Sequence, residues 1–343
     1  MSFQSEGAAD SGIQSEGAAD SGIRHRTIRT NGIDMHVAEA GSGKPVVFVH
    51  GFPELWRSWH NQMPAVADAG YRAVAPDMRG YGQTTAPKDV AAYDIHQLTG
   101  DLCGLLDVLG VDKALFVGHD WGAWAMWFMC LLHPDRVEAL CNLSVPYWAR
   151  SAAPPIETLR QVFGENFFYQ IYFQDVGPAE EELGRDPRKT VRRFAWSVSG
   201  EAAEGRDENV LFQMMPAKDI GFLDQMEDPP EGKMAWFSKE DEDYFVEEFS
   251  RTGYFGAVSW YRNIDRNWET TPQLDGAKVM QPALFIAGAG DPVIRMVSPD
   301  GMPEWVPNLK GIELVEGAGH WIHMEKPDEV NTRLLKFIAD VGY

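Results

Sequence analysis

The stretch that decides the fold is ALFVGHDWGAWA, residues 114–125. Its first four residues are apolar and are typical of a buried strand, and the run Trp121–Leu132 is apolar enough to form a buried helix. Asp120 therefore falls on the turn between a strand and a helix, with Gly118 and Gly122 two residues to either side. Glycines at these positions permit an unfavourable backbone at the turn and close packing of the helix on neighbouring strands.

This turn has the form of a nucleophile elbow, usually written G-x-S-x-G, with aspartate in the place of serine. An aspartate side chain has an ordinary pKa of about 3.9, so it is ionised at neutral pH and can attack without a neighbouring base. Attack on a carbonyl would give an anhydride that reverts readily, whereas attack on a saturated, electrophilic carbon leaves an alkyl ester. The stretch therefore predicts displacement at carbon followed by ester hydrolysis. The alternative is that Asp120 only caps the helix that begins at Trp121.

Length and charge limit the classes of protein to consider. A chain of 343 residues suits one large α/β domain, or a domain with a sizeable insertion. Its 51 acidic and 30 basic residues give a net charge of −21, which repels nucleic acids and anionic membrane surfaces. No signal peptide and no membrane-spanning run are evident, so we expect a soluble, cytoplasmic protein. The three cysteines lie in apolar runs without metal-ligand spacing, which favours reduced thiols.

The chain divides into a tail, a core and an insertion. Residues 4–23 contain the segment QSEGAADSGI twice, and this composition predicts a flexible tail over residues 1–24. Residues 25–146 and 269–343 alternate strands with helices, which predicts an α/β fold with a mostly parallel sheet and helices on both faces. Residues 147–268 contain helical and irregular segments without strand candidates, and we expect an inserted helical lid there. The predicted strands are residues 33–39, 46–49, 71–75, 114–117, 137–143, 283–287 and 312–315. A helix is predicted over residues 55–69, and Asp94 can cap another helix that continues to Leu109 and ends at Gly110.

Three residues with the chemistry of a charge-relay set each follow a predicted strand. These are Asp120, Asp291 and His320, in the chain order nucleophile, acid, base of elbow enzymes. Reactive residues of open parallel sheets gather beyond the carboxyl ends of the strands, so we expect the three to meet there.

With these motifs, the chain from about residue 26 to its end resembles the soluble epoxide hydrolases of the α/β-hydrolase fold. The resemblance implies that Asp120 is the nucleophile, that His320 activates the water of the second step, and that Asp291 orients His320. It implies conversion of a small-molecule epoxide to a vicinal diol through an ester on Asp120. It implies neither a metal nor an organic cofactor, no nucleic-acid or membrane partner, and a monomer or homodimer.

The segment His50-Gly51-Phe52-Pro53 resembles the oxyanion loop of this family. By that resemblance the backbone N–H groups of Phe52 and Trp121 would hold the oxyanion formed when water attacks the ester. In the family the peptide bond before this proline is typically cis. We also expect His50, Pro53, Trp121 and Trp260 to contact the substrate.

Two tyrosines of the insertion are similar to the family's paired donors to the epoxide oxygen. They are Tyr169 and Tyr261, with Tyr172 and Tyr254 as nearby alternatives. Ring opening releases an alkoxide, a poor leaving group, and a phenol with a pKa of about 10 can donate to it as the C–O bond breaks.

Two rival functions remain open at this point. A haloalkane dehalogenase would share the aspartate elbow and Trp121, but commonly carries an asparagine in the oxyanion loop, where this chain has Phe52. The second rival is a non-catalytic binding protein, since one fold can host many functions.

Overall fold

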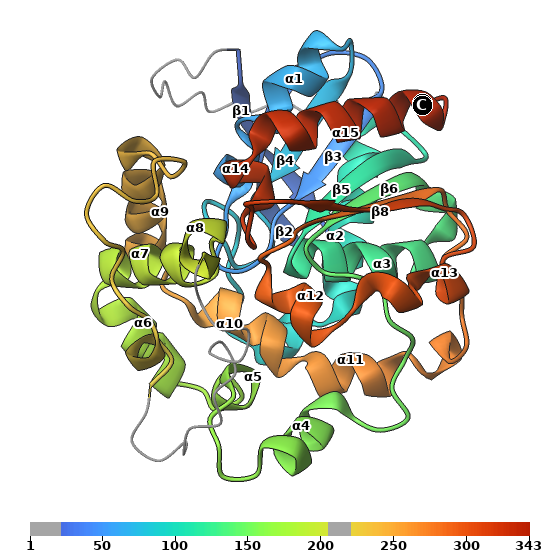
Figure 1. The fold of residues 1–343 in the computed structure, drawn as a ribbon. Coiled ribbons are helices and arrows are strands. Elements are labelled where there is room, and N and C mark those ends of the chain that lie inside the picture. The colour runs from blue at the N-terminus through green and yellow to red at the C-terminus, as the bar shows by residue number, and fades with distance from the viewer. Residues whose placement is uncertain (1–21, 205–220) are drawn as a thin grey trace, which may run out of the picture.

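A computed structural model describes residues 22–204 and 221–343. Residues 1–21, which include all but the last two residues of the duplicated segment, and residues 205–220 of the insertion lie outside the described residues. The framework is an eight-stranded sheet with the order β1-β2-β4-β3-β5-β6-β7-β8 (Figure 1). Strand β2 pairs antiparallel with β1 and β4, and all other pairs are parallel. The strands are β1 Arg24–Thr30, β2 Ile33–Gly41, β3 Pro45–Val49, β4 Arg72–Pro76, β5 Ala114–His119, β6 Val137–Leu143, β7 Ala283–Gly288 and β8 Leu309–Val315.

All seven predicted strands are present, and the prediction of a mostly parallel sheet is confirmed. The missed strand is β1, which lies at the edge of the sheet. Its sequence RHRTIRT buries only Ile28 and Thr30, so it lacks the apolar run that marks the central strands. Strand β3 shows the opposite pattern, because all five of its residues are buried between two layers of helices.

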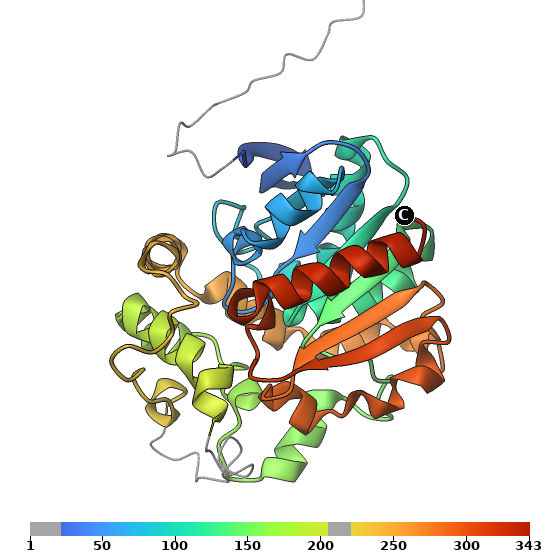
Figure 2. The same ribbon diagram turned by 45° about the horizontal axis from the view of Figure 1, so that its top comes forward.

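Each face of the sheet is covered by helices of the core. Helices α1 (Gln62–Asp68) and α15 (Pro327–Asp340) pack on one face, where Phe48 and Val117 belong to their hydrophobic cluster. Helices α2 (Ile95–Leu109) and α3 (Trp121–Leu132) pack on the other, with Val49 and Phe116. Figures 1 and 2 show α15 lying across the strands on its face. The short helices α12 (Pro292–Met296), α13 (Met302–Trp305) and α14 (Ile322–Glu325) follow β7 and β8.

The helix boundaries follow local chemistry. Asp94 accepts a hydrogen bond from the Gln97 amide at 3.1 Å, and Gly110 ends α2 with a φ of 73°, as predicted. The single helix predicted over residues 55–69 is wrong, because a 3-10 helix at Trp56–Trp59 precedes α1. Pro64 cannot donate a backbone hydrogen bond, and α1 begins at Gln62, so the proline falls in the first turn, where no donor is needed.

A helical segment separates β6 from β7, and its described part contains no strand. Its helices lie to one side of and below the sheet in Figure 1. Arg188 and Arg192 both pair with Glu242, which joins α7 to α9. Arg57 joins the core to α9 through a 2.7 Å contact with Asp241. The helices are α4 Pro155–Phe163, α5 Tyr169–Tyr172, α6 Pro178–Arg185, α7 Pro187–Ser197, α8 Gly200–Ala203, α9 Lys239–Thr252, α10 Phe255–Arg262 and α11 Ile264–Thr270.

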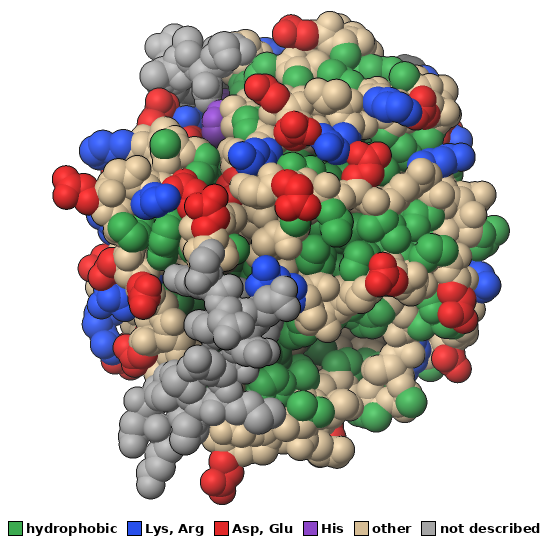
Figure 3. All heavy atoms as spheres, in the orientation of Figure 1, with side chains coloured by type: hydrophobic (Ala, Val, Ile, Leu, Met, Phe, Trp, Pro, Cys, Tyr) green, Lys and Arg blue, Asp and Glu red, His purple; other side chains and the backbone are tan. Residues whose placement is uncertain are grey.

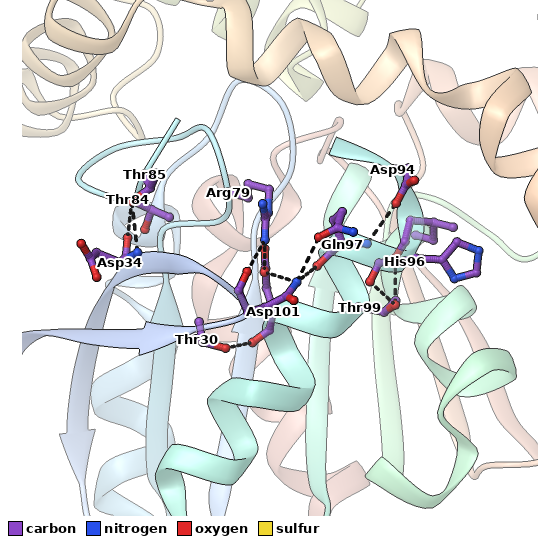
Figure 4. A network of polar contacts seen from close by, with 12 residues as sticks. Thr30, Asp34, Arg79, Thr84, Thr85, Asp94, His96, Gln97, Thr99 and Asp101 are labelled. Carbon is purple, nitrogen blue, oxygen red and sulfur yellow. Dashed lines mark hydrogen bonds and ion pairs between the residues drawn. The ribbon is translucent and has the colours of Figure 1, made fainter. Parts of the chain in front are cut away.

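The loop after β4 is anchored by a buried ion pair. Arg79 contacts both carboxylate oxygens of Asp101 on α2, at 2.8 and 2.5 Å, inside the polar network shown in Figure 4. The Arg79 carbonyl accepts a hydrogen bond from the Trp260 indole at 3.1 Å. This loop therefore holds α2 of the core and α10 of the insertion together, and α10 carries one of the two predicted tyrosine donors.

The surface mixes charges of both signs. On the face seen in Figure 3, acidic and basic side chains are interspersed with apolar ones. Within residues 22–204 and 221–343, no helix combines the length and apolar character needed to cross a membrane.

Candidate active site

Asp120 lies on a strained turn between β5 and α3. Its φ of 51° and ψ of −121° lie in a region that costs about 1–3 kcal/mol for a residue other than glycine. Asp120 occupies the position before the first residue of α3, yet its side chain accepts no capping hydrogen bond from that helix. The Phe52 amide instead donates to Asp120 Oδ1 at 2.7 Å. The carboxylate thus points toward the loop after β3 and does not serve as a simple cap.

The two glycines of the elbow are required by close packing. A Cβ on Gly122 would lie 2.0 Å from the Val49 carbonyl oxygen, and one on Gly118 would lie 2.7 Å from the Ala123 Cα. Both distances are far below van der Waals contact. The elbow can therefore pack against β3 at Gly122, and against the start of α3 at Gly118, only when these two positions carry no side chain, which is what the elbow pattern predicts.

The loop after β3 approaches the elbow equally closely. A Cβ on Gly51 would lie 2.5 Å from Asp120 Oδ1 and 2.6 Å from the Trp121 amide nitrogen. The Phe52–Pro53 peptide bond is cis, as expected for the oxyanion loop of the family. The structure thus brings the backbone of the predicted oxyanion residues, Phe52 and Trp121, to the carboxylate of Asp120.

His320 lies between two carboxylates. Its Nε2 is 3.5 Å from Asp120 Oδ2, and its Nδ1 is 3.2 and 3.1 Å from the two carboxylate oxygens of Asp291. Asp291 is fully buried and also caps α12 by accepting the Val293 amide at 2.8 Å. The three residues predicted to meet at the carboxyl ends of β5, β7 and β8 do so.

The two carboxylates control the protonation of His320. Burial lowers the pKa of this histidine, but the charges of Asp291 and Asp120 and their hydrogen bonds outweigh burial, so its pKa is raised well above the ordinary value. His320 is therefore an imidazolium in the resting site. Loss of the charge on Asp120 would remove one of the causes that hold this proton.

The main-chain carbonyl of His320 is held by two buried side chains. Its carbonyl oxygen accepts hydrogen bonds from His119 Nε2 at 2.7 Å and from the Ser144 hydroxyl at 2.9 Å. His119 Nδ1 lies 2.8 Å from Glu54 Oε2, so both nitrogens of this ring face oxygen atoms. Sequence reasoning assigned no role to Glu54, His119 or Ser144, although Glu54 and His119 are direct neighbours of the two motifs.

Among residues 22–204 and 221–343, one group of side chains has the make-up of a metal site. It consists of Glu54, His119 and His323, all buried. Glu54 Oε2 accepts the Gly51 amide at 2.7 Å and lies 2.8 Å from His119 Nδ1, and Glu54 Oε1 lies 3.2 Å from His323 Nε2. Burial, the largest cause, lowers the pKa of His323 to about 4, so this ring is neutral. We assign the group to hydrogen bonding behind the site.

The two predicted tyrosines lie together above the elbow. The ring of Tyr261, on α10, packs on Trp121 with centroids 4.9 Å apart and on Phe52 at 5.3 Å. The ring of Tyr169, on α5, lies 5.7 Å from that of Tyr261. Burial is the main cause that raises the pKa of both phenols, and the charge of Asp120 raises both further. Both side chains are therefore protonated and within electrostatic reach of Asp120.

The alternative tyrosines have other partners. The Tyr172 hydroxyl donates to Glu182 Oε2 at 2.8 Å, and the ring of Tyr254 stacks on Phe249 with centroids 4.7 Å apart. Neither has a contact with the elbow, which leaves Tyr169 and Tyr261 as the better candidates.

The remaining predicted substrate contacts differ in their surroundings. Pro53 lines a small cavity together with Phe194 and Trp321. His50 is fully buried, and its Nε2 accepts the Met78 amide at 2.9 Å. Trp260 is also fully buried, with its ring 6.0 Å from that of Trp121. Because His50 and Trp260 are enclosed by protein, substrate contact by these two residues stays a prediction.

Comparisons with known proteins agree on one family. The family model described as alpha/beta hydrolase fold matches residues 44–327. Epoxide hydrolase A of Mycobacterium tuberculosis is 48% identical over 92% of this chain and 97% of its own length. Epoxide hydrolase 1 of Siraitia grosvenorii is 42% identical, with 92% of this chain and 97% of its own length covered. The crystal structure of epoxide hydrolase A from Mycobacterium thermoresistibile superposes with a TM-score of 0.87 at 45% identity, covering 92% of this chain and 98% of the other.

Proposed function

The chain belongs to the epoxide hydrolases of the α/β-hydrolase fold, and we propose that it opens its substrate through a covalent ester on Asp120. The observation that carries this proposal is the position of the Asp120 carboxylate. The backbone of Asp120 is strained, and its side chain is only 15% exposed. The carboxylate accepts the Phe52 amide of another loop and no amide of its own helix. A carboxylate that was needed only for capping would accept the free N–H groups of α3.

In the first step Asp120 attacks one epoxide carbon while Tyr169 and Tyr261 donate hydrogen bonds to the epoxide oxygen. One tyrosine comes from α5 and the other from α10, so residues 147–268 act as a lid that supplies the donors. The core, residues 25–146 and 269–343, supplies the nucleophile and the base. The two donors share the negative charge that develops on the oxygen as the C–O bond breaks.

In the second step water attacks the ester carbonyl of Asp120, and His320 takes its proton. Asp291 holds the ring through Nδ1, which leaves Nε2 facing the ester. The amides of Phe52 and Trp121 stabilise the tetrahedral oxyanion, and the Phe52 amide is already directed at this carboxyl group. Collapse of the intermediate breaks the bond between the Asp120 carbonyl carbon and the substrate oxygen, and His320 returns its proton to that oxygen, which releases a vicinal diol. The proton left on Asp120 passes to His320, which restores the carboxylate.

The charge of Asp120 couples the two steps. While it is present, it raises the pKa of Tyr261 and that of His320. Ester formation removes this charge. Without this charge the pKa of each tyrosine falls, which favours proton donation to the alkoxide. The pKa of His320 falls as well, which favours the neutral ring that the second step requires. The proton that His320 loses can return to the tyrosinate, so the cycle closes without a net gain or loss of protons.

The alternative of a haloalkane dehalogenase has less support. The features that favour it are the aspartate elbow and Trp121, and both functions share them. The side chain of Phe52 is buried against Phe173, Phe194 and Tyr261 and offers no N–H donor to a halide. The relatives reported above are epoxide hydrolases.

An acid-quench experiment tests the covalent route. Excess protein is mixed with a slowly converted aryl epoxide, quenched in acid within one turnover, and weighed intact by mass spectrometry. We expect a fraction heavier by the full mass of the epoxide, because ring opening loses no atom, with the added mass on a peptide that contains Asp120. Diol formation with no heavier protein at any quench time would contradict the proposal. A chloroalkane would instead add its mass without the chlorine, which separates the two functions.

A further inference from the structure

Glu325, the last residue of α14, makes three backbone contacts around His320. Its carboxylate accepts the Gly319 amide at 3.2 Å from each oxygen and the Trp321 amide at 3.1 Å. It also accepts the amide of Gly200, the first residue of α8, at 2.7 Å. One side chain thus holds the residues on both sides of the predicted base and a residue of the inserted segment.

The amide of His320, which lies between the amides of Gly319 and Trp321, bonds to the insertion. The His320 N–H donates to the Val198 carbonyl at 2.8 Å. The three consecutive amides of residues 319–321 are therefore all engaged, two by Glu325 and one by the insertion. The His320 carbonyl is held separately by His119 and Ser144, as described above.

Next to Glu325, the main chain of residues 198–200 packs directly against that of residues 318–320. A Cβ on Gly319 would lie 2.3 Å from the Gly200 nitrogen, and a Cβ on Gly200 would lie 2.7 Å from the Ala318 carbonyl carbon. Residues 198–200 and 318–320 consequently form a junction between two glycine-containing segments that are far apart in sequence. A small shift of either segment would move the other, since no flexible side chain separates them.

The surroundings of Glu325 fit a role in placing the backbone. Burial is the largest cause that raises the pKa of its carboxyl, to about 7, while the three amides lower the pKa. In the described part of the chain no cation forms an ion pair with it. Its acceptor capacity is used on main-chain N–H groups, and two of these three groups flank the predicted base.

We propose that Glu325 is a positioning residue that holds His320 at the ester and fixes the 198–200 segment of the insertion to the His320 loop. This rests on the proposed function, because it assigns Glu325 to the second chemical step. Attack by Asp120 needs the elbow and the tyrosines, none of which Glu325 touches. Ester hydrolysis needs the Nε2 of His320 in place.

The test separates the two steps in the Glu325→Gln variant. Glutamine keeps the size of the side chain but offers one acceptor oxygen in place of two, and its NH₂ group faces an N–H donor. In single-turnover experiments we expect ester formation at the wild-type rate and ester hydrolysis slowed by roughly ten- to hundredfold, the range for a small misplacement of a reacting group. The alkyl-enzyme should then accumulate, and kcat should fall by the same factor as hydrolysis. The matched control is Glu329→Gln, four residues further on, where an exposed carboxylate pairs with Arg333.

Equal slowing of ester formation and hydrolysis, or no change in either, would overturn the positioning role. Glu325→Asp provides a second variant that keeps the charge but shortens the reach, and we expect the same selective slowing to a smaller extent. A Glu325→Asp protein that loses thermal stability while both rates stay at the wild-type values would show a structural role alone. If wild-type protein forms diol with no ester detectable, the covalent route fails as well, which distinguishes that failure from the failure of this proposal.

Discussion

Replacing His320 with glutamine should produce a protein that forms the ester but cannot release it. Glutamine has no basic nitrogen at neutral pH, so water at the Asp120 carbonyl would lose its general base, a loss that typically costs roughly 10²- to 10⁴-fold in rate. Ester formation needs no base and should continue. We expect intact-protein mass spectrometry to show nearly all of the variant heavier by the mass of the epoxide after mixing.

The control for this variant is His133→Gln, at the far end of α3, which should leave both steps unchanged. The charge balance of the site gives a further check. His320 is protonated between Asp120 and Asp291, and the neutral variant would leave these two carboxylates without a cation between them. A His320→Gln protein that turns over at the wild-type rate without any adduct would place the base elsewhere.

The second large effect is expected from the two tyrosines. Changing both Tyr169 and Tyr261 to phenylalanine removes every donor assigned to the epoxide oxygen while keeping the rings that pack against Trp121 and Phe52. The alkoxide would then leave without protonation, and the rate of ester formation should fall by roughly 10³-fold or more. Each single variant should fall by about ten- to hundredfold, because the remaining phenol still donates and the two effects are not additive.

Stopped-flow quenching of tryptophan fluorescence, calibrated by acid-quench mass spectrometry, would give the rate of ester formation. Tyr172→Phe is the matched control, since its hydroxyl bonds to Glu182 and not to the elbow. Ester hydrolysis should be affected much less than ester formation in the tyrosine variants. A double variant that forms the ester as fast as the wild type would remove both tyrosines from the mechanism.

Much of the fold could be predicted because the central strands are short apolar runs that end at turn residues. The edge strand β1 could not, since RHRTIRT is mostly exposed and its pairing with β2 is a tertiary contact. The helix predicted over residues 55–69 is divided between a 3-10 helix at Trp56–Trp59 and α1, which begins at Gln62 with Pro64 in its first turn, and the apolar pattern did not reveal this break. The strained φ of Asp120 was expected from the glycines around it.

Asp120, Asp291 and His320 could be predicted because each stands directly after a strand, and the oxyanion residues because they lie in motif turns. The two tyrosines lie on helices of the insertion, and only the resemblance to the family pointed to them. Glu54 and His119 were missed because they contact each other across 65 residues of sequence. Ser144 and Glu325 were missed because they bind main-chain groups that the fold brings to them from elsewhere in the chain. Glu325 and Gly200, for example, are 125 residues apart. No spacing of residues in the sequence indicates such a contact, because the acceptor meets its donors only in the folded chain. Trp260 was predicted to contact the substrate because it precedes Tyr261 in the insertion. In the structure its indole donates a hydrogen bond to the Arg79 carbonyl inside the protein.

The central claim, that Asp120 becomes covalently bonded to the substrate, is tested most directly by one turnover in water enriched in heavy oxygen. Excess protein is mixed with an epoxide in labelled water, and the diol and the peptide containing Asp120 are weighed separately. Water that attacks the ester carbonyl leaves its oxygen in the carboxylate, so we expect label in Asp120 and an unlabelled diol from the first turnover. Heavy oxygen in the diol with none in Asp120 would mean that water attacks the epoxide directly, and would contradict the account.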